Sequence, residues 1–225
     1  MATLQLRKPK TATAILLGVG IAANCFAQVE LTEAENFSTG FEALEGYSPG
    51  YLQSDPVWNI DGSSYPLIGG FGVNDSYGLG LDQNAALSID FTSVTASPVG
   101  WIDFYVKPAF GSSEDLPVSF PLGQAALTGF VSVGLDGAIY ALHGDGLGNG
   151  AWIDTGYMVA LDGSVAADWL RMTYRLDYAT LSWDLFLNSQ LQAIDLGFID
   201  GNAPPLSAFS IQGASEGATL FDEFQ

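Results

Sequence analysis

Apolar and polar side chains alternate most clearly between Asp168 and Asn188. In the first half of this stretch every second residue is apolar, and these residues are Leu170, Met172, Tyr174, Leu176 and Tyr178. The second half repeats the pattern with Trp183, Leu185 and Leu187. A period of two is typical of a strand with one buried face, so the two halves predict a β-hairpin.

The register of this hairpin follows if Ala179 and Thr180 form its loop. The resulting pairs are Leu176 with Trp183, Tyr174 with Leu185, Met172 with Leu187, and Arg175 with Asp184. Apolar residues then face apolar ones, and opposite charges face each other. Ala-Thr lacks the positive-φ chemistry of a two-residue hairpin turn, so a longer loop is the alternative.

Short alternating runs separated by Gly, Asn, Asp, Ser and Pro continue through the rest of the chain from Asn36 onward. Trp101 to Lys107 is a strong example, and no window of 12 or more residues carries the 3.6-residue period of a helix. Many short strands predict one all-β antiparallel sandwich or barrel over residues 36–225. We expect Trp101, Trp169 and Trp183 to belong to its core.

The first 27 residues differ from the remainder. Arg7, Lys8 and Lys10 precede a small-residue and apolar run, and Ala27 closes a stretch suited to cleavage. This pattern predicts a signal peptide over residues 1–27, followed by an acidic lead-in over 28–35. The alternative is a membrane anchor, but the apolar run of about 13 residues is shorter than the ~20 that span a bilayer. We therefore expect a secreted or periplasmic protein without membrane insertion.

The chain is strongly acidic, with a formal charge of −19, and removal of the signal peptide makes it more so. Of its six basic residues only Lys107, Arg171 and Arg175 remain, while all 25 carboxylates stay, so the formal charge is 3 − 25 = −22. Such a charge repels nucleic acid and anionic lipid and favours neutral surfaces or divalent cations as partners. The single cysteine, Cys25, leaves with the signal, so no disulfide is expected.

Several segments together resemble a known superfamily. They are Phe37 to Glu42, Gly46-Tyr47, Trp58, Tyr77 to Leu81, Trp169 to Tyr178, Trp183 to Asn188 and Leu220 to Asp222. Their order is similar to the concanavalin A-like lectin/glucanase superfamily, and more narrowly to laminin-G-like and pentraxin-like domains of exported bacterial proteins. The resemblance implies a jelly-roll β-sandwich whose concave face and edge bind glycans, sometimes with calcium. Ser189 departs from it, because relatives often have Gly after the position of Asn188.

Catalytic patterns are weak in this sequence. Glucanases of the superfamily carry Glu-x-Asp-x-x-Glu on one strand, and none of the eight glutamates fits that spacing. Glu42 and Glu45 are the nearest pair and are typical of a solvated turn. His143 is the only histidine, and a lone histidine at a strand end is more typical of a structural role than of a catalyst. A hydrolase or lyase is therefore the less favoured class.

A glycine-rich loop follows His143 and offers oxygen ligands. Asp145 and Asn149 lie within it, and Asp136 could assist them. Oxygen-rich loops of this kind suit calcium, although Asp-Gly is first of all turn chemistry, so a bound calcium and a plain turn both stay open.

Sugar binding requires an exposed aromatic plane with a few polar groups beside it. Trp152, which follows the glycine loop, is the best candidate, with Tyr157 beyond it, and Tyr47 with Tyr51 is a second possibility. Arg171 and Arg175 could anchor a sugar, or could form ion pairs with Asp177 and Asp184 on a sheet surface. We therefore expect an exported, non-catalytic binding or adhesion domain for neutral glycans, the alternative being a structural extracellular protein.

Overall fold

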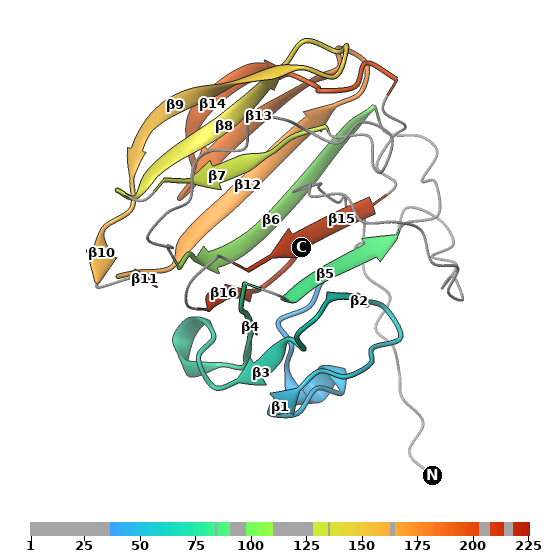
Figure 1. Cartoon of the computed structure of the whole chain (residues 1–225), viewed down its shortest axis with the longest axis vertical. Helices are drawn as coiled ribbons and strands as arrows, with labels where there is room; N and C mark the ends of the chain where they lie inside the picture. The colour runs from blue at the N-terminus through green and yellow to red at the C-terminus, as the bar shows by residue number, and fades with distance from the viewer. Residues whose placement is uncertain are drawn as a thin grey trace.

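The strands of the chain pair antiparallel throughout the residues that the computed structural model describes, which are 37–83, 85–90, 98–109, 128–134, 136–162, 165–202, 208–213 and 218–225. They form an all-β jelly-roll sandwich, as the alternation predicted (Figure 1). The signal peptide predicted at 1–27 and the acidic lead-in at 28–35 lie outside the described residues, and so does the rest of the chain that these ranges omit.

One large sheet and three smaller ones make up the fold. The large sheet has the order β1-β3-β4-β16-β6-β12-β13-β14, and the others are β15-β5-β2, β7-β8-β9 and β10-β11. In chain order the strands are β1 (Gly50–Tyr51), β2 (Asn59–Gly62), β3 (Leu67–Gly69), β4 (Gly78–Leu81), β5 (Ala85–Asp90), β6 (Val99–Lys107), β7 (Val131–Val133), β8 (Ala138–Gly144), β9 (Gly150–Met158), β10 (Leu161–Asp162), β11 (Val165–Ala166), β12 (Leu170–Asp177), β13 (Ser182–Leu187), β14 (Gln190–Gly197), β15 (Ala208–Gln212) and β16 (Thr219–Asp222). Two short 3-10 helices, η1 (Ala43–Glu45) and η2 (Val73–Asp75), lie between strands, and no helix among the described residues is long and apolar enough to cross a membrane.

The core lies between the large sheet and the smaller ones. In Figure 1 the β7-β8-β9 sheet covers the part of the large sheet that contains β12 to β14, and β14 contacts both β8 and β9. The β15-β5-β2 sheet covers β6, where Phe209 of β15 lies 6.1 Å from Phe104, centroid to centroid. Apolar residues from all these layers form a single buried cluster, which makes one hydrophobic core.

The central hairpin has the predicted register. Strands β12 and β13 pair Leu176 with Trp183, Tyr174 with Leu185, Met172 with Leu187 and Arg175 with Asp184. The side chains expected to face inward are buried, except that of Tyr178, which is half-buried just beyond β12. The rings of Tyr174 and Trp183 stack with their centroids 5.4 Å apart. The loop is the longer alternative, because the strands end at Asp177 and Ser182 and Leu181 adopts a positive φ of 55°.

Strand β6 corrects one prediction about the core. Its inward residues are Ile102, Phe104 and Val106, while Trp101 lies on the opposite side with 46% of its surface exposed. Trp101 is therefore not a core residue, because the strict alternation of β6 places it on the same side as Asp103. Trp183 is buried as expected, and Trp169 is only half-buried just before β12.

The large sheet and the β7-β8-β9 sheet approach each other closely where β8 faces the end of β14. A Cβ atom on Gly197 would lie 2.3 Å from the carbonyl oxygen of Gly144, and one on Gly144 would lie 2.4 Å from the backbone of Phe198. Only glycine allows such an approach of two backbones. His143 contributes to the same junction, since its Nδ1 accepts a hydrogen bond of 3.0 Å from the Gly197 N–H.

Candidate functional site

All three basic residues that follow residue 27 lie on one side of the large sheet. We call this side the outer face; it is turned away from the core and is defined by Trp101, Asp103, Tyr105 and Lys107 of β6, Arg171, Thr173, Arg175 and Asp177 of β12, and Ser182, Asp184 and Phe186 of β13. The strand register sets these residues in rows: Trp101 is opposite Arg175, and Arg175 is opposite Asp184. The next row joins Asp103, Thr173 and Phe186.

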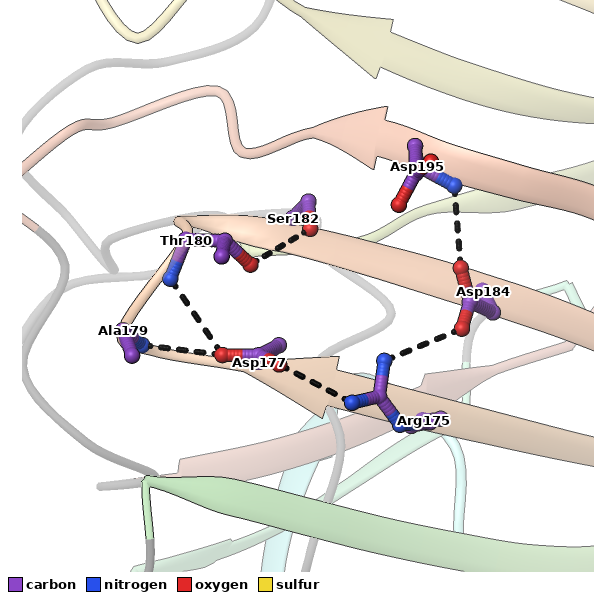
Figure 2. Close-up of polar contacts among 7 residues, drawn as sticks. All are labelled: Arg175, Asp177, Ala179, Thr180, Ser182, Asp184 and Asp195. Carbon is purple, nitrogen blue, oxygen red and sulfur yellow. Dashed lines mark hydrogen bonds and ion pairs between the residues drawn. The ribbon is translucent and has the colours of Figure 1, made fainter.

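Arg175 is held by two carboxylates on this face (Figure 2). It donates through Nη2 to Asp177 at 2.9 Å and through Nη1 to Asp184 at 3.1 Å. The other oxygen of Asp184 accepts from the backbone N–H of Asp195 at 2.9 Å, at a bulge of β14. These contacts confirm the ion pairs predicted for Arg175, and they raise its pKa, chiefly through the bond to Asp184.

Asp177 also organises the hairpin loop. Its Oδ1 accepts from the backbone N–H groups of Ala179 at 3.1 Å and Thr180 at 3.2 Å, as Figure 2 shows. Desolvation by itself would raise the pKa of Asp177, but the hydrogen bonds from Thr180, Ala179 and Arg175 outweigh it and lower the pKa. The carboxylate is therefore ionised at neutral pH, and it fixes both the loop and one side of the guanidinium.

Arg171 forms a second fixed pair on the outer face. Its Nε lies 2.9 Å from Oδ2 of Asp103, and its Nη2 donates to the same oxygen. The hydroxyl of Thr173 donates to Oδ1 of Asp103 at 2.6 Å, so the carboxylate is held between β6 and β12. The bond to Asp103 raises the pKa of Arg171, whose side chain is still 41% exposed. Arg171 can therefore also contact a ligand.

Trp101 gives this face an aromatic plane. Its ring lies 6.0 Å from that of Phe186, centroid to centroid, at an interplanar angle of 39°, so the two rings meet across β12. Beyond Phe186, Leu191 of β14 is 48% exposed. An exposed tryptophan bordered by fixed arginine and carboxylate groups can stack on the C–H face of a ring while the polar groups bind hydroxyls.

Trp152 and Tyr157 lie elsewhere, on β9 of the smaller sheet. Trp152 is half-buried and packs on Phe130 with ring centroids 5.3 Å apart. Tyr157 packs against the core, and its hydroxyl oxygen accepts a 2.8 Å hydrogen bond from Nδ2 of Asn188, at the end of β13. The structure thus separates these two residues from each other and places neither in the rows that contain Arg171 and Arg175.

Two of the three suggested metal ligands lie together. The Oδ2 of Asp145 accepts from Nδ2 of Asn149 at 2.9 Å, and its Oδ1 accepts from the backbone N–H groups of Leu147 and Asn149. The bond from the Asn149 side chain is the main cause of a lowered pKa at Asp145. Asp136 lies at the other end of β8, where it accepts from the N–H of Ala138. Within the described residues, no group of three or more His, Cys, Asp or Glu could hold a metal ion.

The sequence around Trp101 contains a signal that this residue faces solvent. By alternation, Asp103 and Lys107 lie on the same side of β6 as Trp101. The other side carries only Ile102, Phe104 and Val106 after Gly100. Polar residues on the parity of a tryptophan indicate that the tryptophan faces solvent. The partnership of Arg171 with Asp103, 68 residues away, could not have been found from local pattern.

No family model matches the chain, and no curated protein matches it. Among solved structures, it is similar to domain 4 of AbnA, a GH43 extracellular arabinanase from Geobacillus stearothermophilus determined in complex with arabinotriose, with a TM-score of 0.45, 13% identity, and coverage of 74% of this chain and 80% of that one. It is also similar to a structure named sialidase, with a TM-score of 0.39 and 12% identity, covering 78% of this chain and 14% of that chain.

Proposed function

We propose that the protein is an exported, non-catalytic carbohydrate-binding or adhesion domain that binds neutral glycans on the outer face of its large sheet. The observation that carries the proposal is the exposure of Trp101, at 46%, directly opposite the fixed Arg175. Trp101 and Phe186 would stack on sugar rings, and the arginine and carboxylate groups beside them would bind hydroxyls.

The polar groups of this face are already ordered by their own contacts. Arg175 and Arg171 are each held by carboxylates, so binding a ligand would cost little side-chain entropy. An arginine has five N–H donors. In Arg175, two of them donate to the carboxylates of Asp177 and Asp184, so three can donate to other acceptors. A fixed array of donors and acceptors suits the many hydroxyls of a sugar.

Charge supports a neutral ligand. Among the residues that define the outer face around Trp101, Lys107, Arg171 and Arg175 are matched by Asp103, Asp177 and Asp184, which gives 3 − 3 = 0. The other 25 − 3 = 22 carboxylates have no basic residue after position 27 to offset them. Around Trp101 a ligand therefore meets little net charge.

Export is proposed from the sequence of residues 1–27, with secretion or the periplasm as the destination. A calcium ion at Asp145 and Asn149 is proposed only as an accessory to binding, because those side chains already satisfy each other. The loop they close lies at the end of β8, in the smaller sheet.

A glycan array on the purified protein tests the proposal, run with calcium and with a chelator. The informative comparison is wild type against Trp101→Ala, with Trp152→Ala as a matched tryptophan variant on the other sheet. We expect Trp101→Ala to weaken binding to neutral glycans at least tenfold and Trp152→Ala to leave it unchanged.

Three other results would change the proposal. Loss of binding in Trp152→Ala alone would move the site to β9, and loss with the chelator would make calcium part of it. No binding of any neutral glycan by the wild-type protein would refute the carbohydrate proposal and favour a structural extracellular role.

A further inference from the structure

A second group of exposed aromatic residues lies at the far edge of the large sheet. Tyr51 is 69% exposed, Tyr65 is 53% exposed and Leu67 is 38% exposed. Tyr51 and Leu67 are direct partners in the β1-β3 ladder, so their side chains lie on the same side. Tyr65 precedes Leu67 by two residues, with the buried Pro66 between them, and the alternation keeps it on that side. We call these three residues the tyrosine platform.

The tyrosine platform belongs to the same outer face as Trp101. Strand pairing connects it in one row across the sheet, which runs Tyr51, Leu67, Gly80, Leu220 and Lys107. Directly opposite residues in neighbouring strands share a side, and Lys107 is on the outer face. The buried neighbours Ile68, Leu79 and Phe221 occupy the adjacent row and face the core.

The part of this row next to the platform is filled by an aromatic ring from a loop. A Cβ atom on Gly80 would lie 3.4 Å from Cζ of Phe71, and one on Gly69 would lie 2.4 Å from its Cε1. The ring of Phe71 therefore rests on the backbone of β3 and β4, where side chains are absent. It extends the apolar surface of Leu67 toward β16.

A carboxylate lies beside the tyrosines. The β3-β4 ladder ends at the pair Leu67 and Gly80; Tyr65 lies two residues before Leu67, and Asp82 lies two residues after Gly80. The hydroxyl of Ser64 donates to Asp82 at 2.8 Å, which holds this carboxylate at the rim. The platform thus repeats the combination seen around Trp101, an exposed aromatic plane with an ordered carboxylate next to it.

The two aromatic areas are well separated. Across the sheet, β1 is four strands from β6, which corresponds to about 19 Å at ~4.8 Å per strand. Along β6, Trp101 lies six residues from Lys107, which corresponds to a further distance of about 20 Å. A twist of about 20 to 25° per strand also turns the two surfaces by roughly a right angle. One short oligosaccharide therefore cannot cover both areas.

We propose that the tyrosine platform is a second carbohydrate-binding site, so that the domain binds two segments of a neutral polysaccharide or joins two chains. This inference rests on the function proposed above for the Trp101 area. Three exposed side chains are far fewer than the 20 to 30 residues per side of a stable protein interface, but they suit a sugar ring. No Lys or Arg of the chain lies on β1, β3 or β4, so an anionic ligand would meet no compensating charge there.

Isothermal titration calorimetry with neutral hexasaccharides, chosen from β-glucan, xylan, mannan and arabinan series, tests this inference. The variants are Tyr51→Ala/Tyr65→Ala, Trp101→Ala, and Leu44→Ala as a control, since Leu44 is 97% exposed but lies in η1. We expect two sites per molecule in wild type and in the control, and one site in each of the other two variants. Affinity for the corresponding polymer, measured by affinity electrophoresis, should fall at least tenfold when either area is removed, because avidity is lost.

The outcomes separate this inference from the proposed function. One site in wild type, abolished by Trp101→Ala and unchanged by Tyr51→Ala/Tyr65→Ala, would refute the second site and leave the first intact. One site that is lost only in the tyrosine variant would refute the site at Trp101 and the bivalency with it. No hexasaccharide binding by wild type would refute both. Circular dichroism of each variant checks that a loss of binding is not a loss of folding. We expect all variants to fold, because Tyr51, Tyr65 and Trp101 are exposed.

Discussion

Replacing Trp183 with alanine should be the most damaging single change in the central hairpin. Its side chain is fully buried, stacks on Tyr174 and also lies against the backbone at Gly129, where a Cβ atom would be 3.0 Å from the indole. An indole buries about 200 Å², which at about 25 cal/mol per Å² is an upper bound of about 5 kcal/mol. Since the cavity relaxes only in part, we expect the free energy of unfolding to fall by about 3 to 5 kcal/mol.

Trp183→Phe should behave differently, for a reason visible in the structure. The Nε1 of Trp183 is buried, and it has no hydrogen-bond partner among the residues that the structure describes. Phenylalanine removes this unpaired N–H, whose burial costs roughly 1 to 3 kcal/mol, and so offsets part of the lost packing. We expect Trp183→Phe to cost less than half as much as Trp183→Ala.

Urea denaturation at 25 °C followed by far-UV circular dichroism measures both values without depending on tryptophan fluorescence. Trp101→Ala is the matched control, because the same side chain is removed from the outer face, and its cost should stay near 1 kcal/mol. A loss below about 1 kcal/mol for Trp183→Ala would mean that the buried and exposed faces of the hairpin have been assigned the wrong way round.

Two further predictions concern carboxylates. Arg175→Ala should lower the free energy of unfolding by about 1 to 2 kcal/mol, which is more than the loss expected for Asp177→Asn. The reason is that Arg175→Ala leaves Asp184, whose side chain is only 9% exposed, without its cation. Equal losses of the two variants in urea denaturation would contradict this. Asp222 is fully buried and accepts from the Val73 N–H at 2.7 Å and the Ser76 hydroxyl at 3.0 Å, and burial raises its pKa above 3.8. A raised pKa means that the folded state binds the proton more tightly, so its contribution to stability is present below 3.8 and is lost as pH rises through the folded-state pKa. The stability of Asp222→Asn relative to wild type should therefore increase with pH from about 4 upward in pH-dependent thermal denaturation, and a constant difference would show that Asp222 is not the group responsible.

The hairpin could be predicted in detail because its information is local. Opposite charges at Arg175 and Asp184 and bulky apolar residues at Leu176 and Trp183 fit only one register when the turn is short. The loop length could not be predicted, because the loop contains no Gly, Asn or Asp that favours a positive φ. It is stabilised instead by the Asp177 side chain, and Leu181 adopts a positive φ although leucine does not favour one. All-β class and antiparallel pairing followed from the same alternation over the rest of the chain.

The candidate site was only half predictable. The clear alternation of their strand predicts Arg171 and Arg175 as surface residues, but Trp152, the aromatic candidate that the sequence favours, lies on another sheet. Trp101 and Asp103 reach them only because β6 pairs with β12, about 70 residues away in sequence. The tyrosine platform likewise depends on the pairing of β1 with β3 and of β3 with β4. Which strands become neighbours is a property of the whole fold, and local alternation does not encode it.

Because the positive charges of residues 28–225 lie on one face, the charge distribution of the molecule is asymmetric. With three cations on β6 and β12 and a formal charge of −22 over residues 28–225, the centres of positive and negative charge do not coincide, and the protein carries a permanent electric dipole. Near any negatively charged surface, the electrostatic torque favours the orientation in which the outer face points toward that surface. The effect extends about 10 Å at an ionic strength of 0.1 M and fades in more saline media, so the arrangement orients the molecule before any contact is made.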